Sequence, residues 1–191
     1  MTVLVGSAGL DLDQLRDYLN EASRIIAVDG GLHHLEALGI KPHLILGDLD
    51  SYRGSPPEGV RVFPRVKDFS DMEAALKLVA DEKTYIFGAT GGRLDHFLSV
   101  LKLVEARENI EIINKNNRLF YRKGSFTLPK QEGYFSLFTE DGAEVTIRGA
   151  SYNLERKKVH AQSSLLLSNS WQGDVSIEVS KGWVLVVLSQ D

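Results

Sequence analysis

Hydrophobic positions in the first 113 residues follow two alternating patterns. Short, continuously apolar runs predict strands, and apolar residues spaced three or four positions apart predict helices. The predicted strands span residues 3–5, 25–28, 44–46, 60–63, 85–87 and 110–113. The predicted helices run through 12–19, 35–38, 70–79 and 94–106. Strands that are apolar on both faces and alternate with helices are typical of a parallel sheet covered on both sides. This part of the chain therefore predicts an α/β domain with a mostly parallel sheet.

Two of these helices carry more specific signals. Ser70 and Glu73 form a Ser-x-x-Glu capping box, which predicts a helix start at this point. In the helix over 94–106, the spacing of apolar residues predicts which side chains face the core. They are Phe97, Leu98, Leu101 and Val104.

The pattern changes near Asn114, after which no helix is predicted. Short apolar runs separated by turn residues appear at 119–121, 134–138, 144–147, 165–167, 175–179 and 183–188. Asp141-Gly142 and Lys181-Gly182 are predicted to be turns, and Arg156-Lys157-Lys158 is predicted to be a solvated hairpin turn. Residues 115–130 are predicted to be a basic linker that holds one strand. This pattern predicts a C-terminal antiparallel β-sandwich. The predicted domains are residues 1–117 and 118–191. The smaller one should pack against the first domain, a second copy, or both.

Composition narrows the class of protein. The 191 residues carry a net charge of −4 and contain no cysteine. The acidic balance argues against a nucleic-acid surface, and the missing cysteines exclude disulfides, thiolate nucleophiles and zinc ribbons. We find neither a signal-peptide pattern nor an apolar run long enough to span a membrane. We therefore expect a cytoplasmic protein.

Glycine and aspartate gather where the predicted strands of the first domain end. Four clusters stand out, at residues 29–31 (DGG), 47–51 (GDLDS), 67–71 (KDFSD) and 88–96 (GATGGRLDH). Ligands of open α/β sheets bind beyond the carboxyl ends of the strands, so these clusters can converge on one site. Glycine lets backbone amides approach phosphate, and aspartate provides oxygen ligands for Mg²⁺. Together they predict an enzyme that handles a metal–nucleotide.

The carboxylates of these clusters are candidate metal ligands. Asp48 and Asp50 are two residues apart, so in an extended segment their side chains face the same side and could chelate a divalent cation. Asp71 and Asp95 could complete the set. The alternative is structural, because aspartates also cap turns and stabilise the first turn of a helix.

The run GATGGRLDH joins a strand to a helix N-terminus, where exposed amides bind anions. Arg93 adds a planar donor fork suited to phosphate. The run is neither a Walker A motif nor a GxGxxG fingerprint, and a glycine-rich turn can also serve tight packing alone. Gly6-Ser7-Ala8-Gly9 resembles a second phosphate loop. His96 could act as a general base and Lys67 could neutralise phosphate, although a satisfied helix histidine and a solvated lysine are the alternatives.

The ordered set of motifs resembles the thiamine pyrophosphokinase (thiamine diphosphokinase) family. The four clusters match in order, and Gly149-x-x-Tyr152-x-Leu154 and Leu167-Ser168-Asn169 match in the second half. The resemblance implies an N-terminal nucleotide domain, a C-terminal thiamine-binding sandwich, and a homodimer with active sites shared between subunits. It implies transfer of the terminal pyrophosphoryl group of ATP to the thiamine hydroxyl, with Mg²⁺, giving thiamine diphosphate and AMP.

The resemblance also implies roles for individual residues. The metal ligands would be Asp48, Asp50 and Asp71, with Asp95 in the same catalytic cluster. The residues around ATP would be Gly30, Gly31, Lys67, Gly91, Gly92 and Arg93. The contacts to thiamine would be Ser168, Asn169 and an aromatic residue, for which Trp171 is a candidate and Trp183 stays open as the alternative.

Three rival functions stay open at this point. A pyrophosphokinase could use another hydroxymethyl heterocycle, such as a pterin, as acceptor. A nucleotide-binding sensor could hold the same metal without turnover. A structural α/β protein could use its acids only as caps, although four converging clusters make this the weakest rival.

Overall fold

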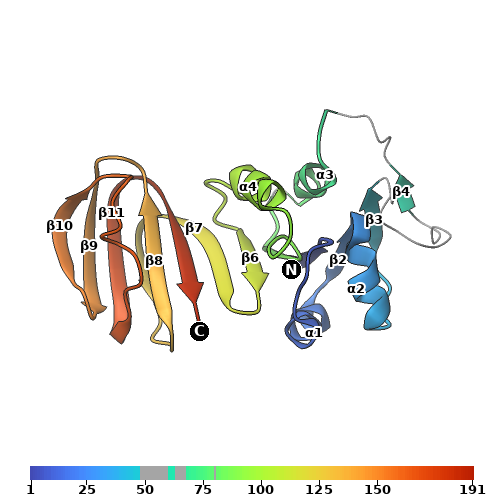
Figure 1. The fold of residues 1–191 in the computed structure, drawn as a ribbon, viewed down its shortest axis with the longest axis horizontal. Coiled ribbons are helices and arrows are strands. Elements are labelled where there is room, and N and C mark those ends of the chain that lie inside the picture. Colours follow the sequence, from blue (N-terminus) through green and yellow to red (C-terminus); the bar gives the residue numbers. More distant parts are fainter. Residues whose placement is uncertain (48–59, 63–67, 80) are drawn as a thin grey trace. The chain divides into compact units, whose positions relative to one another are not determined.

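The computed structural model describes residues 1–47, 60–62, 68–79 and 81–191 (Figure 1). Contacts between residues divide the chain into two compact units. The first unit comprises Met1–Glu105 and Asn109–Lys115. The second comprises Ala106–Glu108 and Asn116–Asp191.

The first unit alternates strands and helices, as predicted. Its strands are β1 (Thr2–Val5), β2 (Arg24–Val28), β3 (Leu44–Gly47), β4 (Val60–Val62), β5 (Thr84–Phe87) and β6 (Ile110–Asn114). Its helices are α1 (Leu12–Glu21), α2 (Leu32–Ala37), α3 (Asp71–Lys77) and α4 (Leu94–Leu103), with a short 3-10 turn, η1 (Asp29–Gly31), before α2. The strands are ordered β6-β5-β1-β2-β3-β4 and every neighbouring pair is parallel. The carboxyl ends of β1, β2, β3 and β5 therefore lie along one edge, which confirms the prediction of a parallel sheet.

Alternation along the strands explains why both faces of this sheet are covered. Val3 and Val5 lie in the same apolar cluster as Leu15 of α1 and Leu35 of α2. Leu4 points to the opposite face, because successive strand residues alternate, and it is fully buried there. Helix α3 contacts β2, β3 and α4. The first unit is therefore the layered α/β arrangement that the sequence predicted.

The predicted capping box at α3 is partly confirmed, whereas the inward face of α4 is partly wrong. Ser70 Oγ accepts a hydrogen bond of 3.1 Å from the backbone amide of Glu73. In α4, Leu98 is 59% exposed and Val100, which was not predicted to face inward, is 6% exposed. Apolar residues lie on more than one side of this helix, so the pattern alone did not identify the covered side. Val104 is buried, as predicted.

The second unit is antiparallel throughout its described pairings. Its strands are β7 (Asn117–Leu128), β8 (Tyr134–Thr139), β9 (Ala143–Ala150), β10 (Leu154–Val159) and β11 (Trp171–Ser189). Strand β11 pairs with β7 along its length, with β9 near its start and with β8 near its end. Strand β10 lies outside β9. All five strands contribute to one apolar cluster, so this unit fits the predicted β-sandwich.

Three local predictions in the second unit are wrong, and a fourth is partly confirmed. Lys181-Gly182 is not a turn between two strands, because it lies within β11 at an irregularity of the β7–β11 register. Gly182 has φ +65°, which only glycine adopts easily, so it accommodates the irregularity without ending the strand. Arg156-Lys157-Lys158 belongs to β10, whose charged and exposed residues suit a sheet edge. Residues 165–167 form no strand. The predicted linker does hold one strand, β7, but this strand takes up most of its length.

Within the ranges that the structure describes, no helix combines the length and apolar character that a bilayer crossing requires.

Candidate functional site

Two loops of small residues lie side by side at the carboxyl edge of the parallel sheet. The loop after β1 (residues 6–9) and the loop after β5 (residues 88–92) are joined by backbone hydrogen bonds. Gly6 donates to the Phe87 carbonyl at 2.8 Å, and Ala8 donates to the Gly88 carbonyl at 3.0 Å. The structure therefore brings together two of the segments that the sequence predicted to bind phosphate.

Glycines at this edge permit backbone contacts that a side chain would prevent. A Cβ at Gly88 would lie 2.2 Å from the Gly6 carbonyl oxygen, and Gly88 has φ +67°. A Cβ at Gly31 would lie 1.8 Å from the Val5 carbonyl oxygen. Gly47 ends β3 against Asp29, whose Cα would lie 3.0 Å from an added Cβ. The DGG turn thus packs tightly on β1, with Gly30 and Gly31 both buried.

The loop after β5 ends at an uncapped helix. Asp11 and Ser70 cap α1 and α3 with side-chain oxygens, whereas the N-cap residue of α4, Arg93, caps no amide, and in the first turn of α4 the His96 amide donates to Asp95 Oδ1 at 3.0 Å. The first amides of a helix have no intrahelical acceptor and carry partial positive charge. Gly91 and Gly92, both exposed, immediately precede this terminus. An oxyanion is therefore the ligand that this corner would attract.

Arg93 and Asp95 form an exposed ion pair at the same terminus. Arg93 Nε donates to Asp95 Oδ1 at 3.1 Å, and Arg93 Nη2 donates to Oδ2. Their side chains are 71% and 63% exposed. The hydrogen bond from Arg93, aided by the His96 amide, lowers the pKa of Asp95, and the same pair raises the pKa of Arg93. The donor fork predicted for phosphate thus holds a carboxylate in this structure, and His96 is exposed beside it.

Some of the predicted metal ligands lie within the described residues, and others lie outside them. Asp71 is the first residue of α3 and is half-buried. Its neighbour Met72 lies against Gly6, because its Cε would be 3.5 Å from a Cβ there, and the start of α3 is therefore close to the loop after β1. Asp48, Asp50 and Lys67 lie outside the described residues. Across the described ranges, no three His, Asp or Glu side chains are close enough to hold a metal ion.

Asn169 is tied into the second unit by its own backbone and side chain. Its amide and carbonyl both bond to Phe135 of β8, at 2.9 and 2.8 Å. Its side-chain oxygen accepts from the amides of Tyr152 and Ser170, and its side-chain nitrogen donates to the Tyr152 carbonyl. The side chain is 5% exposed. These bonds give Asn169 a structural role, which the motif alone did not reveal.

Ser168 and Trp171 occupy different environments. Ser168 is exposed and has φ +54°, which is unusual for a residue other than glycine and typical of functional or strained positions. Trp171 is 8% exposed and packs edge-on against Phe135, with ring centroids 5.0 Å apart. Trp183 is half-buried, with Lys123 Nζ 5.4 Å from its ring centroid. Ser168 is therefore the more accessible of the predicted thiamine contacts.

Two side chains that were not predicted from the sequence hold the loops after β1 and β5. His34 Nε2 lies 3.0 Å from the Ala8 carbonyl oxygen, so α2 braces the loop after β1. Asn114, at the end of β6, donates to Thr90 Oγ1 at 2.8 Å and braces the loop after β5. The signal available in the sequence was their position: both are polar residues close to the ends of apolar segments.

These features define a class of protein: an α/β unit with an anion-attracting sheet edge, followed in the same chain by an antiparallel β unit. Residues 15–114 match the family described as thiamin pyrophosphokinase, catalytic domain, and residues 125–184 match the thiamin pyrophosphokinase, vitamin B1 binding domain. The chain belongs to the thiamin pyrophosphokinase family.

Individual relatives agree with this assignment over the full length. The thiamine pyrophosphokinase of Bacillus subtilis (strain 168) is 29% identical, and the match covers 100% of this chain and 99% of the relative. A crystal structure of thiamine pyrophosphokinase from Bacillus subtilis superposes with a TM-score of 0.88 at 28% identity, covering 100% of both chains. The structure from Geobacillus thermodenitrificans gives a TM-score of 0.85 at 29% identity, covering 100% of this chain and 98% of the other.

Membership of the family establishes the reaction class. The chain is a kinase-type transferase that moves a pyrophosphoryl group from ATP to thiamine and forms thiamine diphosphate. The match to a vitamin B1 binding domain favours thiamine over the pterin-like acceptor. It also argues against the sensor and the purely structural protein.

Proposed function

We propose that the carboxyl edge of the parallel sheet holds ATP while the β unit holds thiamine, and that AMP leaves as the second product. One observation supports the placement of ATP at the carboxyl edge of the sheet. The loops at 6–9 and 88–92 lie side by side and end at the uncapped N-terminus of α4. Backbone amides and a helix terminus are a phosphate-binding arrangement, so Gly91, Gly92 and Arg93 are the residues that we assign to the phosphates. Gly30 and Gly31 shape the neighbouring edge, and Lys67 completes the assignment.

Asp48, Asp50 and Asp71 are the proposed Mg²⁺ ligands. Asp71 fits this role, because it is half-buried at the start of a helix beside the loop after β1, and carboxylate oxygens are the ligands Mg²⁺ prefers. Gly47, the residue before Asp48 in the sequence, ends β3 at the same sheet edge. When bound, the metal would neutralise charge on the phosphates.

The remaining chemistry needs alignment more than a protein nucleophile. Attack of the thiamine hydroxyl on the β-phosphorus of ATP breaks the bond to the α-phosphate oxygen and releases AMP. Positioned cations and amides lower the barrier of such transfers by alignment and charge stabilisation. Arg93 is held by Asp95 in this structure, so phosphate would compete with that carboxylate for the guanidinium. Asp95 thereby sets the position of Arg93 before the nucleotide arrives.

The thiamine half rests on Ser168, Asn169 and Trp171. Asn169 fixes the turn that carries Ser168, whose exposed hydroxyl is the group we assign to direct contact. The thiazolium of thiamine is a permanent cation, which neutral hydroxyls and an aromatic ring can hold without a full counter-charge. We assign Trp171 to the wall of this region. Residues 1–117 and 118–191 would then be the nucleotide and thiamine domains.

A homodimer with shared active sites is part of the proposal. Leu94 and Leu98 are one helical turn apart on α4 and both are largely exposed. Leu165 and Leu167 are exposed beside Ser168 in the second unit. Large exposed apolar side chains next to predicted site residues favour a protein partner, and a second copy supplies both surfaces at once.

Product analysis with purified protein tests the function. With ATP, Mg²⁺ and thiamine, we expect AMP and thiamine diphosphate in equal amounts by chromatography, and ADP in place of AMP would contradict pyrophosphoryl transfer. Asp48→Asn and Asp50→Asn should abolish turnover and leave the unfolding temperature nearly unchanged. Asp13→Asn is the matched control, because Asp13 is an exposed α1 residue paired with Arg16. A large drop in unfolding temperature for the first two variants alone would show that those aspartates are structural.

A further inference from the structure

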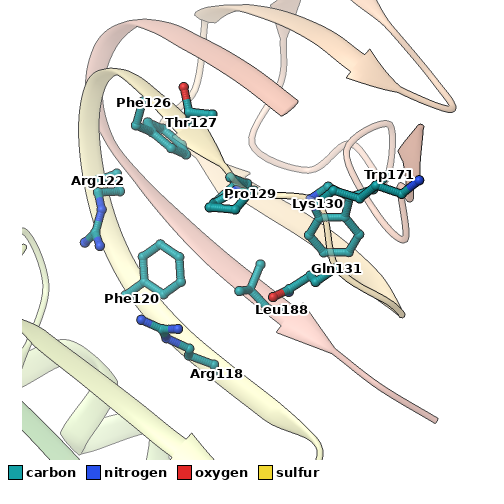
Figure 2. A pocket seen from close by; sticks show the side chains of 11 residues that line it. Arg118, Phe120, Arg122, Phe126, Thr127, Pro129, Lys130, Gln131, Trp171 and Leu188 are labelled. Atoms are coloured by element: carbon teal, nitrogen blue, oxygen red, sulfur yellow. The ribbon is translucent and has the colours of Figure 1, made fainter. Parts of the chain in front are cut away.

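A hollow of about 210 Å³ opens within the second unit, and of its lining residues Trp171 is also assigned to the proposed thiamine region (Figure 2). Its walls come from β7, from the residues that follow β7, and from both ends of β11. The lining residues used below are Arg118, Phe120, Arg122, Lys130, Trp171 and Leu188. All of them belong to the second unit, so the hollow is complete within it.

The alternation of β7 explains how its residues reach one space. Arg118, Phe120 and Arg122 are two positions apart, so their side chains leave the same face of the strand. Figure 2 shows Phe120 between the two arginines, with β7 curving past them. The guanidinium carbons of Arg122 and Arg118 lie 4.4 and 5.6 Å from the Phe120 ring centroid. The strand therefore presents an aromatic ring flanked by two cations.

The charge of the lining has one sign. Arg118, Arg122 and Lys130 are cationic, and none of the lining residues is Asp or Glu. Arg122 Nη1 donates to the carbonyl oxygens of Glu108 and Tyr121, at 3.1 and 2.8 Å, which fixes its guanidinium beside Phe120. A cationic rim attracts an anion and repels a cation. Thiamine carries a permanent positive charge, so this hollow is unsuited to thiamine itself.

The floor of the hollow is apolar, and one of its residues carries a buried hydrogen-bond donor. Phe120 and Leu188 are at most 9% exposed, and Trp171 is 8% exposed. The indole Nε1 of Trp171 is buried, and among the described residues it has no hydrogen-bond acceptor. A buried donor without an acceptor is unfavourable, and a ligand oxygen or ring nitrogen that reached it would relieve that cost.

We propose that this hollow binds a small organic anion consisting of one planar ring with a phosphate or carboxylate group. The ring would lie against Phe120, Leu188 and Trp171, and the anionic group would meet Arg118, Arg122 and Lys130. Drug-sized ligands occupy pockets of roughly 300–1,000 Å³. At about 210 Å³ the hollow suits a single ring and not a nucleotide. The proposal does not depend on the reaction assigned above.

Titration of the full-length protein by calorimetry tests the proposal with four probes: phenyl phosphate, benzoate, phenol and benzyltrimethylammonium. We expect saturable binding of phenyl phosphate or benzoate, at least about tenfold weaker binding of phenol, and no binding of the cation. In the two-dimensional ¹H–¹⁵N spectrum, the anion should shift the Trp171 indole signal and leave that of Trp183 in place. The variant Trp183→Phe assigns the two signals.

Matched variants distinguish anion binding in the hollow from anion attraction to the charged surface in general. Lys130→Gln and Arg118→Gln should each weaken binding of the anion about tenfold, as expected for loss of a hydrogen bond to a charged group. Lys157→Gln, on the exposed edge strand β10, should bind as the unmodified protein does. Equal binding of phenol and phenyl phosphate would overturn the proposal, as would equal effects of Lys130→Gln and Lys157→Gln. Stoichiometric displacement of phenyl phosphate by thiamine would also overturn it, because the hollow would then belong to the acceptor site.

Discussion

Replacing Gly31 by alanine affects stability in two opposite ways at the carboxyl edge of the parallel sheet: through the backbone conformation that alanine prefers and through the packing of the added Cβ. Gly31 has helical dihedral angles, φ −58° and ψ −19°, and alanine is favoured over glycine inside helices by about 1 kcal/mol. Backbone preference alone therefore predicts a small gain in stability. The new Cβ, however, would lie 1.8 Å from the Val5 carbonyl oxygen, far inside the ~3.5 Å of a favourable non-bonded contact.

We expect the packing cost to exceed the gain from helix preference. Overpacking a core typically costs about 1–3 kcal/mol, and the upper end applies here because the obstructing atom is backbone and cannot rotate away. After the gain from helix preference, we expect Gly31→Ala to lose about 2 kcal/mol of unfolding free energy. For a chain of this size, that loss lowers the unfolding temperature by about 4–8 °C.

Thermal and urea unfolding followed by circular dichroism measure the effect. Gly9→Ala is the control, because a Cβ at Gly9 meets nothing within 4 Å. We expect this control to unfold at the temperature of the unmodified protein. A Gly31→Ala variant as stable as the unmodified protein would refute the packing argument. Loss of AMP release without loss of stability would instead indicate that Gly31 contacts the nucleotide directly.

Two further predictions concern residues of the candidate site. Asn169→Ala removes the side-chain bonds that fix the turn carrying Ser168 and should cost about 2–3 kcal/mol of unfolding free energy, measured by urea titration. Ser168→Ala should leave stability nearly unchanged and raise KM for thiamine, and equal destabilisation by both variants would contradict this division. Arg93 lowers the pKa of Asp95, so their pairing stabilises the fold above the ordinary carboxyl pKa, and this contribution is lost as the pH falls through the lowered value. Arg93→Gln should therefore raise the pKa of Asp95 toward about 3.9 in a carboxyl NMR titration, and an unchanged pKa would show that the pair does not form in solution.

The architecture could be predicted from the sequence because its signals are local. Apolar runs of strand length, helical spacing and the Ser70–Glu73 capping box each act within a few residues. The inward face of α4 could not be predicted, because Leu98 and Val100 are both apolar and only the neighbouring elements decide which is covered. Lys181-Gly182 was misread for a similar reason. A glycine next to a lysine is typical of a turn, but pairing with β7 on both sides keeps the strand continuous.

In the candidate site, the meeting of the loops could be predicted from the sequence, whereas the hydrogen bonds of the side chains could not. The loops after β1 and β5 could be expected to meet, since the ends of neighbouring parallel strands share an edge. The pairing of Arg93 with Asp95 depends on side-chain rotamers, and the bonds of Asn169 depend on a strand far away in sequence. A motif indicates which residue types are present and not which of their hydrogen bonds are already used.

Strand β11 makes the second unit a single cooperative element. It pairs with β7, β8 and β9, and its two ends supply Trp171 and Leu188 to the same hollow. Opening any part of β11 therefore exposes amides of several strands at once, so hydrogen exchange there should proceed through global opening of the unit and not through local fraying. Binding at the hollow would slow exchange across all these strands together. A ligand at one end of β11 thus has a direct physical means of stiffening the turn that carries Ser168.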